Sequence, residues 1–223
     1  MASNLYWLIV GSLFFFGIWA AVMFYKHPSW ALAMLLPILV WFVFDPLVFA
    51  LGNALGEGST LHVLHSLRYL LKAIVTPFLL VIAFDQAKRA QVQWTDDPLL
   101  LLGLSIVILA LLVIGVIQGF AGITLDPVIL EGIKQYQPDT PIGWPLAAIA
   151  TLAILMLLGW GVMVKTRAPW LLLGGVLLLV GVLGPIIFSL PSVIAAMTSV
   201  LFVLCLLLME QKLQKIAPNP AIR

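Results

Sequence analysis

The sequence predicts an all-α fold, a polytopic transmembrane helix bundle with seven spans. Of its 223 residues, 63% are hydrophobic and only 9% are charged, whereas a soluble domain typically carries about 25% charged residues. A helix needs roughly 20 apolar residues to cross the hydrocarbon layer, and seven such segments follow one another along the chain. The longest polar stretch covers about 120–142, so residues 1–223 are expected to form a single integral membrane domain.

The expected spans follow the apolar runs, and turn-forming or charged residues separate them. In chain order they cover residues 5–25, 28–51, 61–84, 98–119, 143–164, 169–189 and 191–209. Prolines lie inside three of them, at Pro37, Pro46, Pro77 and Pro185. Proline frees the carbonyl of the residue four positions earlier. It therefore indicates either a kink that helps packing or a broken helix beside a cavity.

The charges between the spans predict the orientation of the chain. Lys and Arg near membrane spans are retained in the cytoplasm. With seven spans, one side of the membrane holds only Lys134 outside the helices, so the N-terminus is expected outside and the C-terminus in the cytoplasm. The cytoplasmic side then holds Lys26, Lys88, Arg89, Lys165, Arg167, Lys212, Lys215 and Arg223. The membrane is a bacterial-type plasma membrane or an internal membrane.

The third span carries a polar stripe on an otherwise apolar helix. At about 100° per residue, its six polar side chains fall within an arc of roughly 120°. Lys72 is expected about 15 Å below the outer end of the span, where a cation costs on the order of 3 kcal/mol. Such a stripe is expected to face the interior of the bundle. Its members are His62, His65, Arg68, Tyr69, Lys72 and Thr76.

Asp45 is the expected counter-ion of this stripe. It lies roughly 9–10 Å below the outer end of the second span, and the short loop after that span favours antiparallel packing on the third. Asp45 is therefore expected to pair with Arg68 or Lys72. Two cations for one deep acid leave a surplus positive charge, which suits an anionic ligand. The alternative is a purely structural ion pair.

Other polar groups are weaker candidates. His62 and His65 face the same way, but Arg68 and Lys72 would repel a dication, so no metal site is expected. The cofactor is unknown. Asp85 and Arg89 are expected in a solvated cytoplasmic loop, and Gln118 is expected to border the pocket. The apolar residues 128–130 are expected to form a short interfacial helix or a lid.

The leading functional hypothesis is binding or processing of an amphipathic, anionic, lipid-like molecule at an outward-facing pocket between the second and third spans. Asp45, Arg68, Tyr69, Lys72 and His62 would bind it. Whether the protein is an enzyme stays open. If it is one, the proton-transfer group is His65, which titrates near neutrality, or Glu57, in the loop before the third span.

Two alternatives from other classes remain. Lys-Pro-Trp edges at 26–30 and 165–170 fit a small carrier built as three plus one plus three spans, although such edges are also generic interface anchors. A non-catalytic accessory subunit would use the stripe to dock a partner helix. The expected partner is a membrane lipid or an amphipathic small molecule, and an oligomer or larger membrane complex stays open. The net charge of +2 is too small to indicate nucleic-acid binding.

Overall fold

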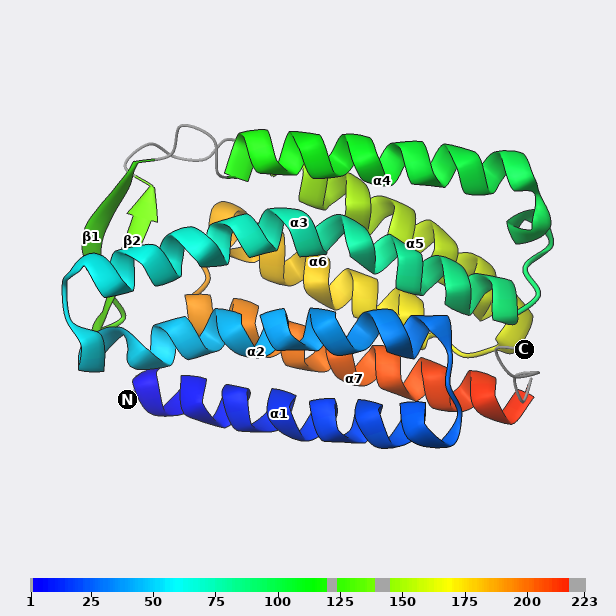
Figure 1. The fold of residues 1–223 in the computed structure, drawn as a ribbon, viewed down its shortest axis with the longest axis horizontal. Coiled ribbons are helices and arrows are strands. Elements are labelled where there is room, and N and C mark those ends of the chain that lie inside the picture. The colour runs from blue at the N-terminus through cyan, green and yellow to red at the C-terminus, as the bar shows by residue number, and fades with distance from the viewer. Residues whose placement is uncertain (1, 120–123, 139–144, 217–223) are drawn as a thin grey trace.

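In the computed structural model, which describes residues 2–119, 124–138 and 145–216, seven long helices run side by side and a β-hairpin covers one end of the bundle (Figure 1). The helices are α1 (Ala2–Lys26), α2 (Trp30–Leu55), α3 (Ser59–Arg89), α4 (Pro98–Gly119), α5 (Leu146–Thr166), α6 (Trp170–Phe188) and α7 (Ser192–Ile216). A short 3-10 helix, η1 (Gln93–Asp96), precedes α4, and strands β1 (Leu125–Leu130) and β2 (Ile133–Pro138) form the hairpin.

All seven helices are long and apolar enough to cross a membrane, so the chain is a multi-pass integral membrane protein. The seven predicted spans are confirmed. The largest differences are at the ends of α3 and α7, which continue to Arg89 and Ile216. In α3, an ion pair between Asp85 and Arg89, four residues apart, lies in this added part of the helix and favours it.

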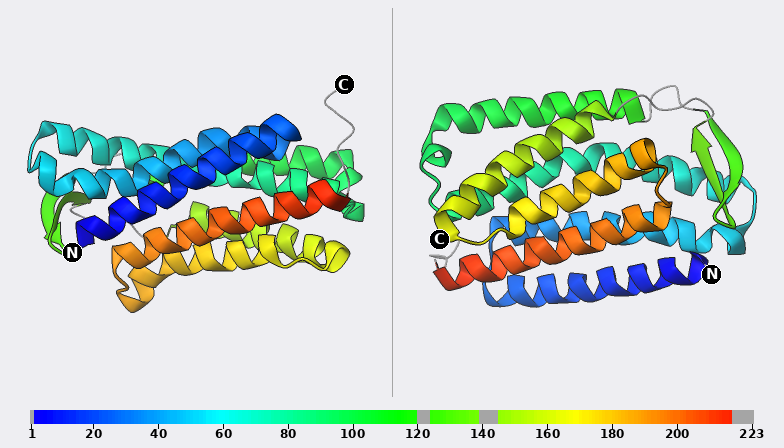
Figure 2. Two further views of the ribbon diagram at one scale, coloured as in Figure 1. Left: turned by 90° about the horizontal axis from the view of Figure 1, so that it is seen from below. Right: turned by 180° about the vertical axis from the view of Figure 1, so that it is seen from behind.

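The helices form two layers that place α3 near the centre. Helices α1 to α4 lie next to one another in chain order, and α5, α6 and α7 form the second layer behind them (Figure 2). The layers meet where α1 contacts α7 and where α3 contacts α5. Helix α4 packs on α3 and α5 only at the edge, so most of its apolar surface faces lipid.

The sequence predicted a short interfacial helix or a lid around residues 128–130. The helix is wrong, because these residues lie in the first strand of the hairpin. Strand β1 pairs antiparallel with β2, from Leu125 opposite Pro138 to Leu130 opposite Ile133. The two loop residues, Glu131 and Gly132, have φ angles of 55° and 75°. Two positive φ angles are the requirement of a type I′ turn, whose twist matches that of paired strands.

Helices α2 and α7 both hold the hairpin. The Asn53 amide nitrogen donates to Gly132 O at 2.8 Å, and Lys134 N donates to Asn53 Oδ1 at 3.0 Å. Glu131 Oε1 accepts from the backbone nitrogen of Ser192 at 2.7 Å. A Cβ on Gly52 would lie 2.2 Å from Lys134 O, so a glycine is required beneath β2.

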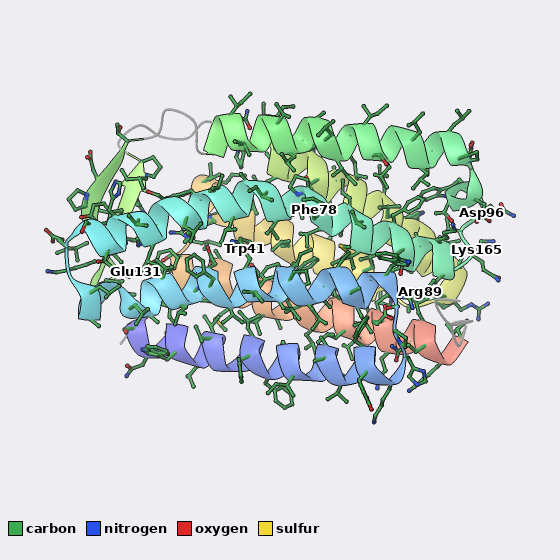
Figure 3. The ribbon with its side chains drawn as sticks, viewed as in Figure 1. Trp41, Phe78, Arg89, Asp96, Glu131 and Lys165 are labelled. Atoms are coloured by element: carbon green, nitrogen blue, oxygen red, sulfur yellow. The ribbon has the colours of Figure 1, made fainter. Side chains whose placement is uncertain are left out.

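We call this end of the bundle the hairpin end and the other the Arg89 end. Glu131 and Arg89 mark them in Figure 3. The N-terminus lies at the hairpin end and the last helix finishes at the Arg89 end (Figure 1). The charge distribution predicts that the hairpin end is outside.

The four prolines within spans lie in continuous helices, not at helix breaks. At Pro77 the freed carbonyl belongs to Ala73. Helix α4 approaches this carbonyl closely, because a Cβ on Gly115 would lie only 3.2 Å from Ala73 O. The small residue lets one backbone cover a polar group that the other helix has left without its usual partner.

The predicted orientation can be tested by labelling single cysteines in a Cys205→Ala background. Asn4 and Lys215 are exposed at opposite ends of the chain. In intact cells a membrane-impermeant maleimide should label Asn4→Cys, and should label Lys215→Cys only after permeabilisation. The reverse pattern would contradict an external N-terminus.

A second prediction concerns the seat of the hairpin. Gly52→Ala should push β2 away from α2, because the added methyl group overlaps Lys134 O. Overpacking of this kind typically costs about 1–3 kcal/mol. Trypsin should then cleave after Lys134 several-fold faster in detergent. Gly58→Ala is the matched control, since its Cβ would meet nothing within 4 Å. Equal cleavage rates in both variants would mean that the hairpin does not depend on this seat.

Candidate functional site

The predicted pairing of Asp45 is confirmed. Arg68 Nε on α3 donates to Asp45 Oδ1 on α2 at 2.8 Å, and the two side chains are 11% and 25% exposed. The antiparallel packing of α2 on α3 that the short loop predicted is what brings them together. Charge-assisted hydrogen bonds are stronger than neutral ones, so this contact ties the two helices at the hairpin end.

Arg68 also orients His65. Its Nη1 lies 3.0 Å from His65 Nδ1. A guanidinium only donates hydrogen bonds, so Nδ1 accepts and the neutral ring carries its proton on Nε2. The guanidinium also lies 4.3 Å from the ring centre of Phe49 and 4.9 Å from that of Tyr69. Two aromatic faces and one carboxylate thus surround the charge.

The hairpin seals His65 from solvent. The residue is 0% exposed, and in the part of the chain that the structure describes its Nε2 has no hydrogen-bond partner. Phe49 meets the imidazole edge to face at 5.7 Å, and Tyr136 of β2 lies 6.2 Å from it. Tyr136 also packs on His62 at 5.1 Å, and His62 itself is exposed. The hairpin thus contacts both histidines, but only His65 is buried.

Glu57 lies apart from this buried group. Its side chain is 53% exposed, and its carboxylate lies 3.8 Å from Lys134 Nζ on the hairpin. The two candidates for proton transfer, His65 and Glu57, are therefore in different surroundings, one sealed and one at the surface. Glu57 serves here as a weak tie between the α2–α3 loop and β2.

Lys72 faces a cavity on the other side of α3. The cavity has a volume of about 120 Å³ and lies between α3, α4 and α5, whereas the sequence placed the pocket between the second and third spans. Within the described ranges no carboxylate lies within 4 Å of Lys72 Nζ, because Asp45 bonds to Arg68 instead. The lining residues are Tyr69, Lys72, Ala73, Thr76, Pro77, Gly115, Gln118, Pro145, Ala147 and Ala148.

The polar stripe is thus divided between two neighbours. His65 and Arg68 face α2 and the hairpin, and Lys72 and Thr76 face α4 and α5. Tyr69 belongs to both groups, since its ring contacts Arg68 and also lines the cavity. Gln118 lines this cavity, although the sequence placed its pocket between the second and third spans. The α5 side of the lining is apolar and gave no signal in the sequence.

A second buried ionic group lies at the Arg89 end, where the sequence predicted a solvated loop, and that prediction is wrong. Arg89 Nε donates to Asp85 Oδ2 at 3.0 Å, and Arg89 Nη2 bonds to Glu210 Oε2 of α7. Asp85 Oδ2 also accepts from the backbone nitrogen of Ala31 at 3.2 Å, and Ser29 Oγ donates to Glu210 Oε1 at 2.9 Å. The missed signal was Glu210, a lone acid one residue beyond the predicted seventh span.

No group of three His, Cys, Asp or Glu side chains suited to a metal ion comes together among the described residues. Comparison of the chain with family models, curated proteins and solved structures finds no match. The function is therefore argued from the geometry of the site.

The importance of the Asp45–Arg68 pair can be measured by removing the acid alone. Asp45→Asn should lower stability in detergent by roughly 3 kcal/mol, because it leaves a largely buried guanidinium without its counter-ion. Glu57→Gln, which changes an exposed carboxylate, should cost less than about 1 kcal/mol. Thermal unfolding of both variants checks this. Equal losses would mean that Arg68 does not depend on Asp45.

Proposed function

We propose that the protein binds an anionic amphiphile in the cavity between α3, α4 and α5. The ligand would carry a phosphate or carboxylate head group on a lipid-like apolar body. The proposal rests on the surroundings of Lys72. This cation lies deep in a membrane helix and lines the cavity, and no carboxylate of the described chain lies within 4 Å of its Nζ.

The position of Lys72 makes its charge costly. It lies two residues before residue 74, the midpoint of α3 (59–89), and a cation at the centre of a membrane helix costs about 3 kcal/mol. The side chain is exposed to the space beside the bundle. An anionic head group placed against Nζ would supply the missing counter-ion.

The surrounding groups suit the two ends of such a molecule. Besides Lys72, the Tyr69 hydroxyl and the Gln118 amide offer hydrogen-bond donors to a head group. The volume of about 120 Å³ is several times what one ordered water needs, enough for a head group but too small for a whole lipid. The apolar body would then lie along the lipid-facing surface of α4.

The two alternative functions have less support. An accessory subunit that docks through the stripe needs the whole stripe exposed. His62 and Lys72 are exposed, but His65 is 0% and Arg68 11% exposed. A carrier with matched halves needs free polar groups in α5 to α7. The buried hydroxyls of Thr151 and Thr198 instead bond to carbonyls of their own helices, Ala147 O and Ala195 O.

Native mass spectrometry of the purified protein tests the proposal. Wild type should carry a co-purified anionic lipid, and Lys72→Met should lose most of it. A charge-assisted contact of about 1.5–3 kcal/mol corresponds to roughly ten- to hundred-fold in affinity. Lys88→Met is the matched control, because Lys88 is an exposed cation at the Arg89 end of the same helix, away from the cavity. It should leave the lipid occupancy unchanged.

A neutral change in the lining should act in the same direction but more weakly. Gln118→Leu removes hydrogen bonds without removing charge, so it should weaken binding less than Lys72→Met does. If wild type and Lys72→Met carry the same lipids at the same occupancy, the proposal is wrong and Lys72 has a structural role.

A further inference from the structure

The ionic group at the Arg89 end has an unequal count of charges. Two carboxylates, Asp85 and Glu210, contact one guanidinium, Arg89, so −2 and +1 leave a formal charge of −1. The N-terminus of α2 adds a favourable partial charge, since Ser29 caps it and the Ala31 amide donates to Asp85. By contrast, the pair at the hairpin end has one acid and one Arg.

The two carboxylates are not equivalent. Glu210 is 1% exposed, and both of its oxygens are bonded, Oε1 by Ser29 and Oε2 by Arg89. Asp85 uses only Oδ2, which accepts from Arg89 and Ala31. Among the described residues no hydrogen bond reaches Asp85 Oδ1, and this side chain is the more exposed, at 21%.

Buried polar atoms without a partner occur on the same two helices, α3 and α7, that carry this group. Gln86 Oε1, Arg89 Nη1 and Gln214 Nε2 are buried without a partner within the described part of the chain. Gln86 is 1% exposed, and its Nε2 donates to Leu206 O at 3.4 Å, one helical turn before Glu210 on α7. Buried polar groups without protein partners are usually bonded to ordered water. Each of these two donors and this acceptor would then bond to water.

We propose that Asp85 is a proton-binding site supplied by water at the Arg89 end. A proton from bulk water binds to Asp85 Oδ1, Arg89 stays paired with Glu210, and the formal charge of the group changes from −1 to 0. The groups that contact the site are Arg89 from α3, Glu210 from α7, and Ser29 with the Ala31 amide from α2. Gln86 and Gln214 lie one residue from Asp85 and one helical turn from Glu210 along the chain. Because these contacts join three helices, proton binding would alter how α2 is held against α3.

Infrared difference spectroscopy across a pH titration tests this directly. Wild type should show the carbonyl-stretch band of a protonated carboxyl that appears and disappears with pH while the protein stays folded. Asp85→Asn should abolish the band. Asp45→Asn is the matched control, because it removes the acid of the one-to-one pair, and it should keep the band.

Isotope editing keeps the test valid if Asp85→Asn fails to fold. Labelling aspartate side-chain carbonyls of wild type with carbon-13 should shift the band, and labelling glutamate should not. A band that shifts with glutamate labelling would overturn the assignment to Asp85. The absence of any such band in folded wild type would also overturn the proposal. So would thermal stabilisation of the protein by sodium at fixed ionic strength without a carboxyl band, because the group would then bind a cation and not a proton.

Discussion

The hydrocarbon of a membrane offers no partner to a charged or hydrogen-bonding group, so such groups within the bundle must be matched inside it. Helix α3 carries several of these charged groups, among them Arg68 and Arg89. Arg68 near one end pairs with Asp45 of α2, and Arg89 at the other end contacts Asp85 in the same helix and Glu210 of α7. These ionic groups fix α3 against its neighbours at both ends. The hairpin is seated on the first group and the cavity lies between them.

The hairpin and two aromatic rings partly shield the first ionic group from water. Tyr136 contacts both histidines, and Phe49 and Tyr69 flank the guanidinium of Arg68. Excluding water strengthens the attraction between Arg68 and Asp45, because electrostatic interactions grow as the local dielectric falls. Tyr69 is the one described side chain that both contacts Arg68 and lines the cavity. A ligand beside Lys72 would therefore reach the ionic group through that ring.

The apolar runs sufficed to predict the seven helices, because length and hydropathy alone decide which segments can cross a membrane. The short loop after the second span also sufficed to place Asp45 beside the polar stripe, because it forces antiparallel neighbours, but the sequence left both Arg68 and Lys72 as possible partners. The hairpin was not predicted, because its apolar strand residues also fit a surface helix. The feature that separates the two structures is the turn at Glu131 and Gly132. The direction of Lys72 was also missed. An arc of roughly 120° is wide enough to face two neighbouring helices, and only the packing of α4 and α5 decides between them.

Arg68 and Lys72 lie one turn apart on the same helix, but only Arg68 is paired with a carboxylate. A buried cation adds little stability even when it is paired, because desolvation offsets most of the attraction. Arg68 at least recovers that cost through Asp45 and two aromatic faces. Lys72 lines a cavity, and no carboxylate of the described chain lies within 4 Å of it. A leucine at that position would avoid the cost of the charge, and the proposed anionic ligand is the partner that would account for Lys72.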